Sequence, residues 1–124
     1  MSVSGAGSES GAGGVCVSGA GSIYTVSLRV AADAADAADR IGRKDPDLAR
    51  QLRRAAASTP LNIAEGAGSL GKNRRARYAN ALGSAYEVAA CFDVAVAMRC
   101  IPDPGPDVRQ RLDHVIGTLV NLTR

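Results

Sequence analysis

The chain has 124 residues, enough for one domain, and a formal net charge of +3. Alanine is abundant, aromatic residues make up 3% and tryptophan is absent, so the composition favours helices packed through small side chains over a β-sheet. No apolar run reaches the roughly 18 residues of a membrane span, and the first residues lack the pattern of a secretory signal.

The cysteine and histidine content gives no metal or disulfide framework. The three cysteines are Cys16, Cys91 and Cys100, and an odd count argues against paired disulfides. The only histidine, His114, has no cysteine or histidine neighbour at metal-ligand spacing. We therefore expect a cytoplasmic protein with no metal site and no cofactor, in which Cys91 is a small buried residue.

Residues 1–21 are of low complexity and contain seven of the fourteen glycines. The hexapeptide Val3–Ser8 recurs unchanged at Val17–Ser22. Such a segment cannot bury enough apolar surface to offset its ordering entropy, so we predict a disordered tail over 1–21 and a folded domain over 22–124.

Two helices are predicted in the first half of the domain. The first covers 23–41, with apolar positions close to a heptad seam and three Ala-Ala-Asp triplets over 31–39. Because the triplet repeats every three residues, its aspartates drift around the helix. The second begins at Asp45-Pro46, where the aspartate can cap and the proline suits the first helical position. Its apolar face is Leu48, Leu52, Ala55, Ala56, Thr59 and Ile63.

Pro60 lies inside the second helix, where it removes one N–H and bends the axis. The apolar rhythm continues past it, so we expect the helix to run on until Gly66, Gly68 and Gly71. Asn62 and Glu65 are three residues apart and share a face. They form either a functional pair or a structural pair, which satisfies groups left open by Pro60 or pairs with a neighbouring helix.

The third helix is predicted from a cap at Asn73 to about Arg99. Its seam is Tyr78, Leu82, Ala85, Ala89, Phe92 and Val96. From Val88 to Met98 it is apolar almost all round, which indicates burial on more than one side and hence self-association.

A fourth helix follows Pro102–Asp107, with Val108, Leu112, Val115, Leu119 and Leu122 on its apolar face. Arg109, Gln110, Arg111 and Asp113 are expected to face away from it. Four helices with short connections predict an all-α, up-down-up-down four-helix bundle.

Charge is unevenly distributed along the chain. Residues 40–77 contain ten bases and three acids, whereas the remainder contains five bases and nine acids. The candidate nucleic-acid-binding residues are Arg50, Arg53, Arg54, Lys72, Arg74, Arg75 and Arg77. One interpretation is a sequence-independent grip on phosphates, and the other is a solvated helix surface. Base stacking is not expected, because the one aromatic residue near the cluster, Tyr78, belongs to the core seam.

Two motifs resemble a bacterial four-helix-bundle family first noticed as proteins encoded in intervening sequences of 23S ribosomal RNA genes. The first is Ser58-Thr59-Pro60-Leu61-Asn62-Ile63-Ala64-Glu65-Gly66, preceded by Gln51–Ala55. The second is Gly83-Ser84-Ala85-Tyr86-Glu87. The family includes the accessory variability proteins of diversity-generating retroelements, and the resemblance covers about residues 23–124.

The resemblance implies a homopentamer with a basic surface and, for retroelement members, binding to a reverse transcriptase and to nucleic acid. Pro60, Asn62, Glu65, Gly66, Ser84 and Glu87 are then structural motif residues. Arg54, Ser58, Leu61 and Glu65 share a stripe, which we expect to meet Ser84 and Glu87 within the chain or across a subunit boundary. No arrangement of nucleophile and base is present, so the predicted function is a non-enzymatic accessory protein, the alternative being a structural or protein-interaction bundle.

Overall fold

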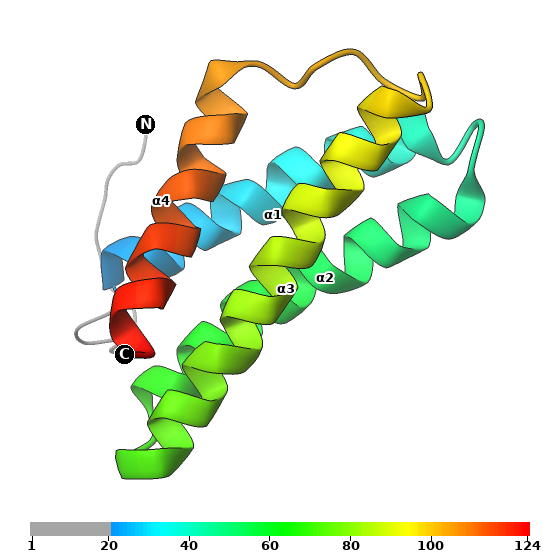
Figure 1. The fold of residues 1–124 in the computed structure, drawn as a ribbon. Helices are drawn as coiled ribbons and strands as arrows, with labels where there is room; N and C mark the ends of the chain where they lie inside the picture. Colours follow the sequence, from blue (N-terminus) through cyan, green and yellow to red (C-terminus); the bar gives the residue numbers. More distant parts are fainter. Residues whose placement is uncertain (1–20) are drawn as a thin grey trace.

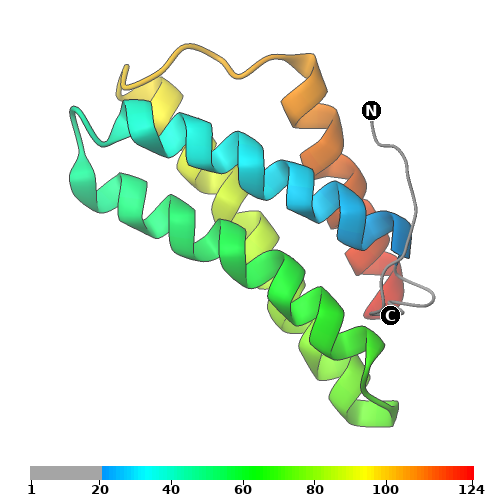
Figure 2. The same ribbon diagram turned by 180° about the vertical axis from the view of Figure 1, so that it is seen from behind.

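The computed structural model describes residues 21–124, which form four antiparallel helices (Figures 1 and 2). They are α1 (Gly21–Ile41), α2 (Pro46–Ala67), α3 (Gly71–Ala97) and α4 (Pro106–Leu122). Each helix packs against the next along the chain, and α4 returns to α1. The predicted up-down-up-down four-helix bundle is therefore confirmed. Cys16 and the predicted tail lie within 1–20, outside the described residues, except for Gly21, which begins α1.

The helix starts show which capping predictions were right. The Asp45 carboxylate accepts a hydrogen bond from the Leu48 N–H at 3.0 Å, and Pro46 occupies the first turn of α2. Asn73, in contrast, does not cap α3. Gly71, with a φ of +57°, lets the chain turn earlier, so the helix begins there after Leu70, which has no side-chain acceptor. The predicted cap at Asn73 is wrong for this reason.

The end of α3 is closed by a left-handed residue. Arg99 has a φ of +63°, and the N–H of Cys100 donates to the Ala95 carbonyl at 2.8 Å, as in a Schellman-type end. Lys44, in the α1–α2 connection, donates through Nζ to the Arg99 carbonyl at 3.0 Å. This contact ties two connections at the same end of the bundle.

The apolar core follows the predicted seams closely. All six predicted positions of α2 are buried, and Phe92 and Ala85 from α3 are almost fully enclosed. Val26 in α1 and Leu82, Ala89 and Val96 in α3 are half-buried and pack against this core. Pro60 is buried within a continuous α2, as expected.

The aspartates of the Ala-Ala-Asp repeat face different neighbours because three residues advance a helix by less than one turn. Asp33 accepts two hydrogen bonds from Arg111 of α4, at 2.9 and 3.1 Å. Asp39 pairs with Arg53 of α2. Arg111 is therefore half-buried at a helix interface, and the prediction that it faces away from the bundle is wrong.

Cysteines within the described residues are unpaired. Cys91 is buried, as predicted, and Cys100 is partly buried. Burial, with a smaller contribution from the charge of Glu87, raises the pKa of the Cys91 thiol above its ordinary value. Over 21–124 no helix is long and apolar enough to cross a membrane.

Candidate nucleic-acid interface

The α2–α3 hairpin extends beyond the ends of α1 and α4 (Figures 1 and 2). We call residues 65–78, which include the turn, the hairpin tip. Every residue from Leu70 to Arg77 is exposed, and Tyr78 is the first buried residue of α3. The first two turns of α3 therefore contribute no core contacts and stand in solvent.

Four basic residues occupy this exposed stretch, and three of them have partners within the chain. Arg74 Nε donates to the Ser69 carbonyl at 2.9 Å, and Arg75 donates to the Arg124 carbonyl at 2.7 Å. Arg77 pairs with the Glu65 carboxylate at 3.2 Å. Lys72 has no such partner among residues 21–124. The tip thus holds four cations against one carboxylate.

The start of α3 adds to this positive character. Leu70 offers no side-chain cap, so the first N–H groups of the helix have no acceptor inside it and carry the positive end of its dipole. Lys72, Arg75, Ala76 and Ala79 lie together on the exposed side of these turns. An anion at this end of the hairpin would meet two cations beside two small residues.

The other predicted basic residues lie elsewhere. Arg54, the nearest to the tip in α2, precedes the end of the helix by about 20 Å of axial rise. Arg50 pairs with Asp47, and Arg53 pairs with Asp39 of α1. The structure therefore divides the seven predicted bases into the tip group and an α2 group, in which two of the three are neutralised by carboxylates.

The motif residues connect α2 to α3. Ser84 Oγ donates to Ser58 Oγ at 2.8 Å, and Asn62 Nδ2 donates to the Ser58 carbonyl and hydroxyl at 2.9 and 3.0 Å. Asn62 thus supports a serine pair and does not reach the Ala56 carbonyl that Pro60 leaves open. The predicted meeting of Ser58 with Ser84 is confirmed within the chain.

The acidic motif residues have separate surroundings. Glu65 pairs with Arg77 in the tip. Across 21–124, no ion pair joins Arg54 to Glu87, although the register set by Ser58–Ser84 and Glu65–Arg77 places these positions almost opposite each other. Their pairing within one chain is not observed.

Gly66 and Tyr78 join the tip to the bundle, a contact that sequence reasoning missed. A Cβ on Gly66 would lie 2.7 Å from Cε1 of the Tyr78 ring. Because that ring is buried, the glycine is needed for the close approach of α2 to α3 here. The signal in the sequence was a glycine inside a helix, followed twelve residues later by an aromatic residue.

A family model described as 23S rRNA-intervening sequence protein matches residues 22–121. The chain belongs to this family. No curated protein and no solved structure matches it.

A second surface of this intervening-sequence family member is the outer face of α3. Its exposed apolar and small residues are Ala79, Gly83, Tyr86, Ala90, Val94, Ala97 and Met98, and its exposed polar residues are Asn80, Glu87 and Asp93. Tyr86 is 52% exposed and Met98 56% exposed. The face opposite the core is therefore also largely apolar. This matches the predicted all-round apolar character of the helix, with its second side in solvent in the single chain.

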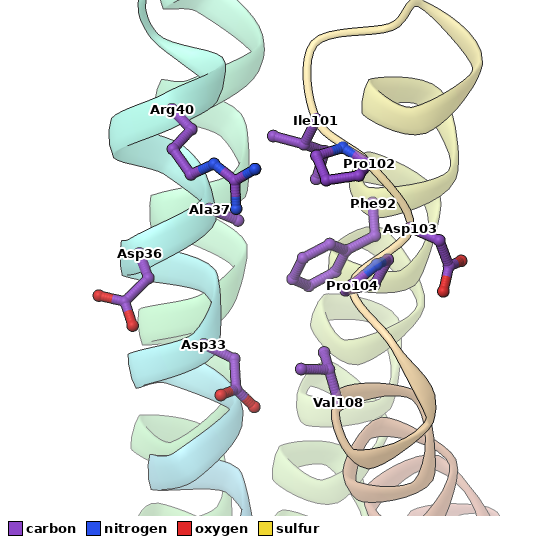
Figure 3. A pocket seen from close by; sticks show the side chains of 10 residues that line it. All are labelled: Asp33, Asp36, Ala37, Arg40, Phe92, Ile101, Pro102, Asp103, Pro104 and Val108. Atoms are coloured by element: carbon purple, nitrogen blue, oxygen red, sulfur yellow. The ribbon is translucent and has the colours of Figure 1, made fainter.

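A cavity of about 200 Å³ lies between α1 and the α3–α4 connection (Figure 3). Arg40 and Asp33 approach it from α1, while Phe92, Pro102 and Pro104 face them. Its ten described lining residues include no serine, cysteine, histidine or lysine, and the Asp33 carboxylate is occupied by Arg111. No group of three or more metal-ligating side chains occurs within residues 21–124.

Proposed function

We propose that this 23S rRNA-intervening sequence protein is a non-enzymatic accessory protein of the bacterial cytoplasm that binds nucleic acid through its hairpin tip. The observation that carries the proposal is the cluster of four bases within six residues on the exposed, protruding part of the α2–α3 hairpin. Cations presented in this way attract phosphates whatever the base sequence.

The binding mode follows from what surrounds the lysine and arginine side chains. Tyr78 is buried, so no described aromatic ring of the tip is available to stack on nucleobases. Recognition then depends on phosphate charge, and the logarithm of the affinity falls with the logarithm of salt concentration. Four phosphate contacts give a slope of about −3 for a single strand.

The test compares two variants that each lose four positive charges. K72A/R74A/R75A/R77A removes the tip bases, and R43A/R50A/R53A/R54A removes bases from the α1–α2 connection and α2. Binding to unrelated single-stranded DNA and RNA is measured by fluorescence anisotropy at several salt concentrations. We expect the tip variant to bind about 100-fold more weakly than the control variant at low salt. Equal losses would contradict a site at the tip.

We also propose that the protein self-associates through the outer face of α3, the homopentamer implied by the family being the expected form. A solvent-facing helix in a monomer normally carries charge along its exposed side, whereas this face has two charged residues between Ala79 and Ala97, Glu87 and Asp93, and Asp93 is paired with Arg109 of α4. Small residues at Ala79, Gly83 and Ala90 allow a second helix to approach closely. Repetition of the tip in an oligomer would strengthen weak contacts through avidity.

The mass in solution tests this second proposal. V94D places a charge in the centre of the outer face, and Q110D places the same charge on an exposed position of α4. By light scattering, we expect V94D to be a folded monomer and Q110D to keep the wild-type mass. A monomeric wild-type protein would contradict the proposal.

The competing function is a protein-interaction bundle with no nucleic-acid role, and the same outer face of α3 is the observation that favours it. A reverse transcriptase, as implied for retroelement members, is one partner such a face could contact. A wild-type protein that assembles but shows no salt-dependent binding to DNA or RNA would favour this alternative.

A further inference from the structure

Glu65 is the one acidic residue in a long basic stretch of the sequence. Residues 48–86 contain seven bases and this single acid. In the folded chain it lies beside the most basic part of the molecule, with its carboxylate 3.2 Å from Arg77.

Arg77 is the one tip cation within the described residues that pairs with a side-chain carboxylate. Arg74 donates to the neutral Ser69 carbonyl, which leaves its guanidinium charge intact, and Arg75 donates to the main-chain oxygen of Arg124. The Glu65 carboxylate therefore cancels one of the four positive side-chain charges of the tip in the free protein.

The pair is placed where it contributes little stability. The side chains are 49% exposed in Arg77 and 56% exposed in Glu65. An ion pair in solvent is easily broken, because water and dissolved ions compete for both partners. Arg77 can therefore leave Glu65 without disturbing the bundle.

We propose that the Glu65 carboxylate is an internal competitor that occupies, on Arg77, the position taken by a nucleic-acid phosphate when the protein is bound. This inference rests on the proposed function. Carboxylates and phosphates offer the same paired acceptor oxygens to a guanidinium, so one can replace the other without rearranging the arginine fork.

The exchange sets a threshold for the ligand. When a single phosphate binds Arg77, the interaction free energy it gains is offset by the interaction that Arg77 loses on leaving Glu65. A polyanion gains further interactions, because it also contacts Lys72, Arg74 and Arg75. The free Glu65 then recruits a cation, so fewer ions are released overall and the salt dependence is weaker than four bases would give. The competitor thus favours extended polyanions over small phosphates and shortens the lifetime of the complex.

The experiment uses E65Q, which keeps the shape of the side chain and removes its charge. D47N is the matched control, because Asp47 also forms an exposed ion pair with an arginine of α2, at the far end of that helix. The ligands are a single-stranded RNA of mixed sequence and inorganic phosphate, with anisotropy and calorimetry as readouts. We expect E65Q to bind the RNA about two- to five-fold more tightly than the wild type, with a salt slope steeper by up to about 0.7. D47N should resemble the wild type.

The R77A background separates exchange from general charge. If Glu65 acts through Arg77, E65Q/R77A binds as R77A does. If E65Q tightens binding equally in both backgrounds, or weakens it because the pair positions Arg77, the proposal is overturned. Thermal unfolding checks that all variants are folded.

The two levels of the proposal fail separately. Binding by the wild type with no difference between E65Q and D47N would overturn the role of Glu65 and leave the proposed function standing. Binding by E65Q but not by the wild type would support the competitor and contradict the proposed function. Binding by neither would overturn both.

Discussion

In the bundle body, charged side chains connect helices around an apolar core, whereas in the hairpin tip they stand in solvent with few neighbours. Arg111 and Asp33, in the body, are 28% and 20% exposed and share two hydrogen bonds. Arg77 and Glu65, in the tip, are about half exposed and share one contact. The fold is thus held together in one region, and charge is left free to exchange partners in the other.

The largest expected effect on stability comes from removing a large side chain from the core of the bundle body. Phe92 is 1% exposed in the centre of the core, so F92A should lower the free energy of unfolding by about 3–5 kcal/mol. Its counterpart in the tip is L70A, at a side chain that is 80% exposed, and we expect a change below about 0.5 kcal/mol. Urea unfolding measures both. Similar losses would mean that the tip carries a core of its own.

The junction between the regions should be the next most sensitive. In G66A the new methyl group collides with the buried Tyr78 ring, and we expect a loss of about 2 kcal/mol. G117A is the control, because a Cβ at that helical position in α4 meets no atom within 4 Å. It should be neutral or slightly stabilising. A neutral G66A would show that Tyr78 can move aside and that the contact is not needed.

Removing one arginine from each region sharpens the contrast. R111A leaves a partly buried Asp33 carboxylate without its bidentate partner and should cost about 1–2 kcal/mol. Hydrogen bonding with Asp33 outweighs burial and raises the pKa of Arg111 above its ordinary value, which is consistent with a favourable pair. R77A should cost less than about 0.5 kcal/mol in the same thermal or urea assay. Equal costs would remove the distinction between body and tip.

The smallest effect is a gain at the opposite end of the bundle. Arg99 adopts a left-handed conformation that glycine adopts without steric cost, so R99G should raise stability by about 0.5–1 kcal/mol. The hydrogen bond from Lys44 is kept, since its acceptor is the backbone carbonyl. A loss of stability in R99G would mean that the arginine side chain contributes more than its strained backbone costs.

The fold could be read from the sequence because each helix carries an apolar seam long enough to fix its register. The seams of α2 and α4 were predicted residue by residue, and Asp45-Pro46 marked a true helix start. The start of α3 was missed, since the sequence shows a glycine at position 71 but not its left-handed backbone conformation. The partner of Arg111 was missed because seam periodicity separates core from surface and does not describe residues at the border between helices.

The candidate site was predictable in part. The sequence placed the cluster Lys72–Arg77 at a helix start, and the structure adds that this start protrudes from the bundle. Whether these basic residues lie near Arg50 and Arg53 depends on distances along two antiparallel helices, which the sequence does not give. The structure places the two sets apart. Ion-pair partners also depend on the rotation of each helix and on long, flexible side chains, so the ties of Arg53 to Asp39 and of Arg77 to Glu65 were beyond reach.

The repeated Ala-Ala-Asp unit of α1 has a consequence for how this chain can vary in length. One added triplet would lengthen the helix by about 4.5 Å and turn everything beyond it by about 60° relative to the first half. Ile41, fully buried at the end of α1, would be rotated out of the core. The core therefore does not tolerate a change in the number of Ala-Ala-Asp triplets.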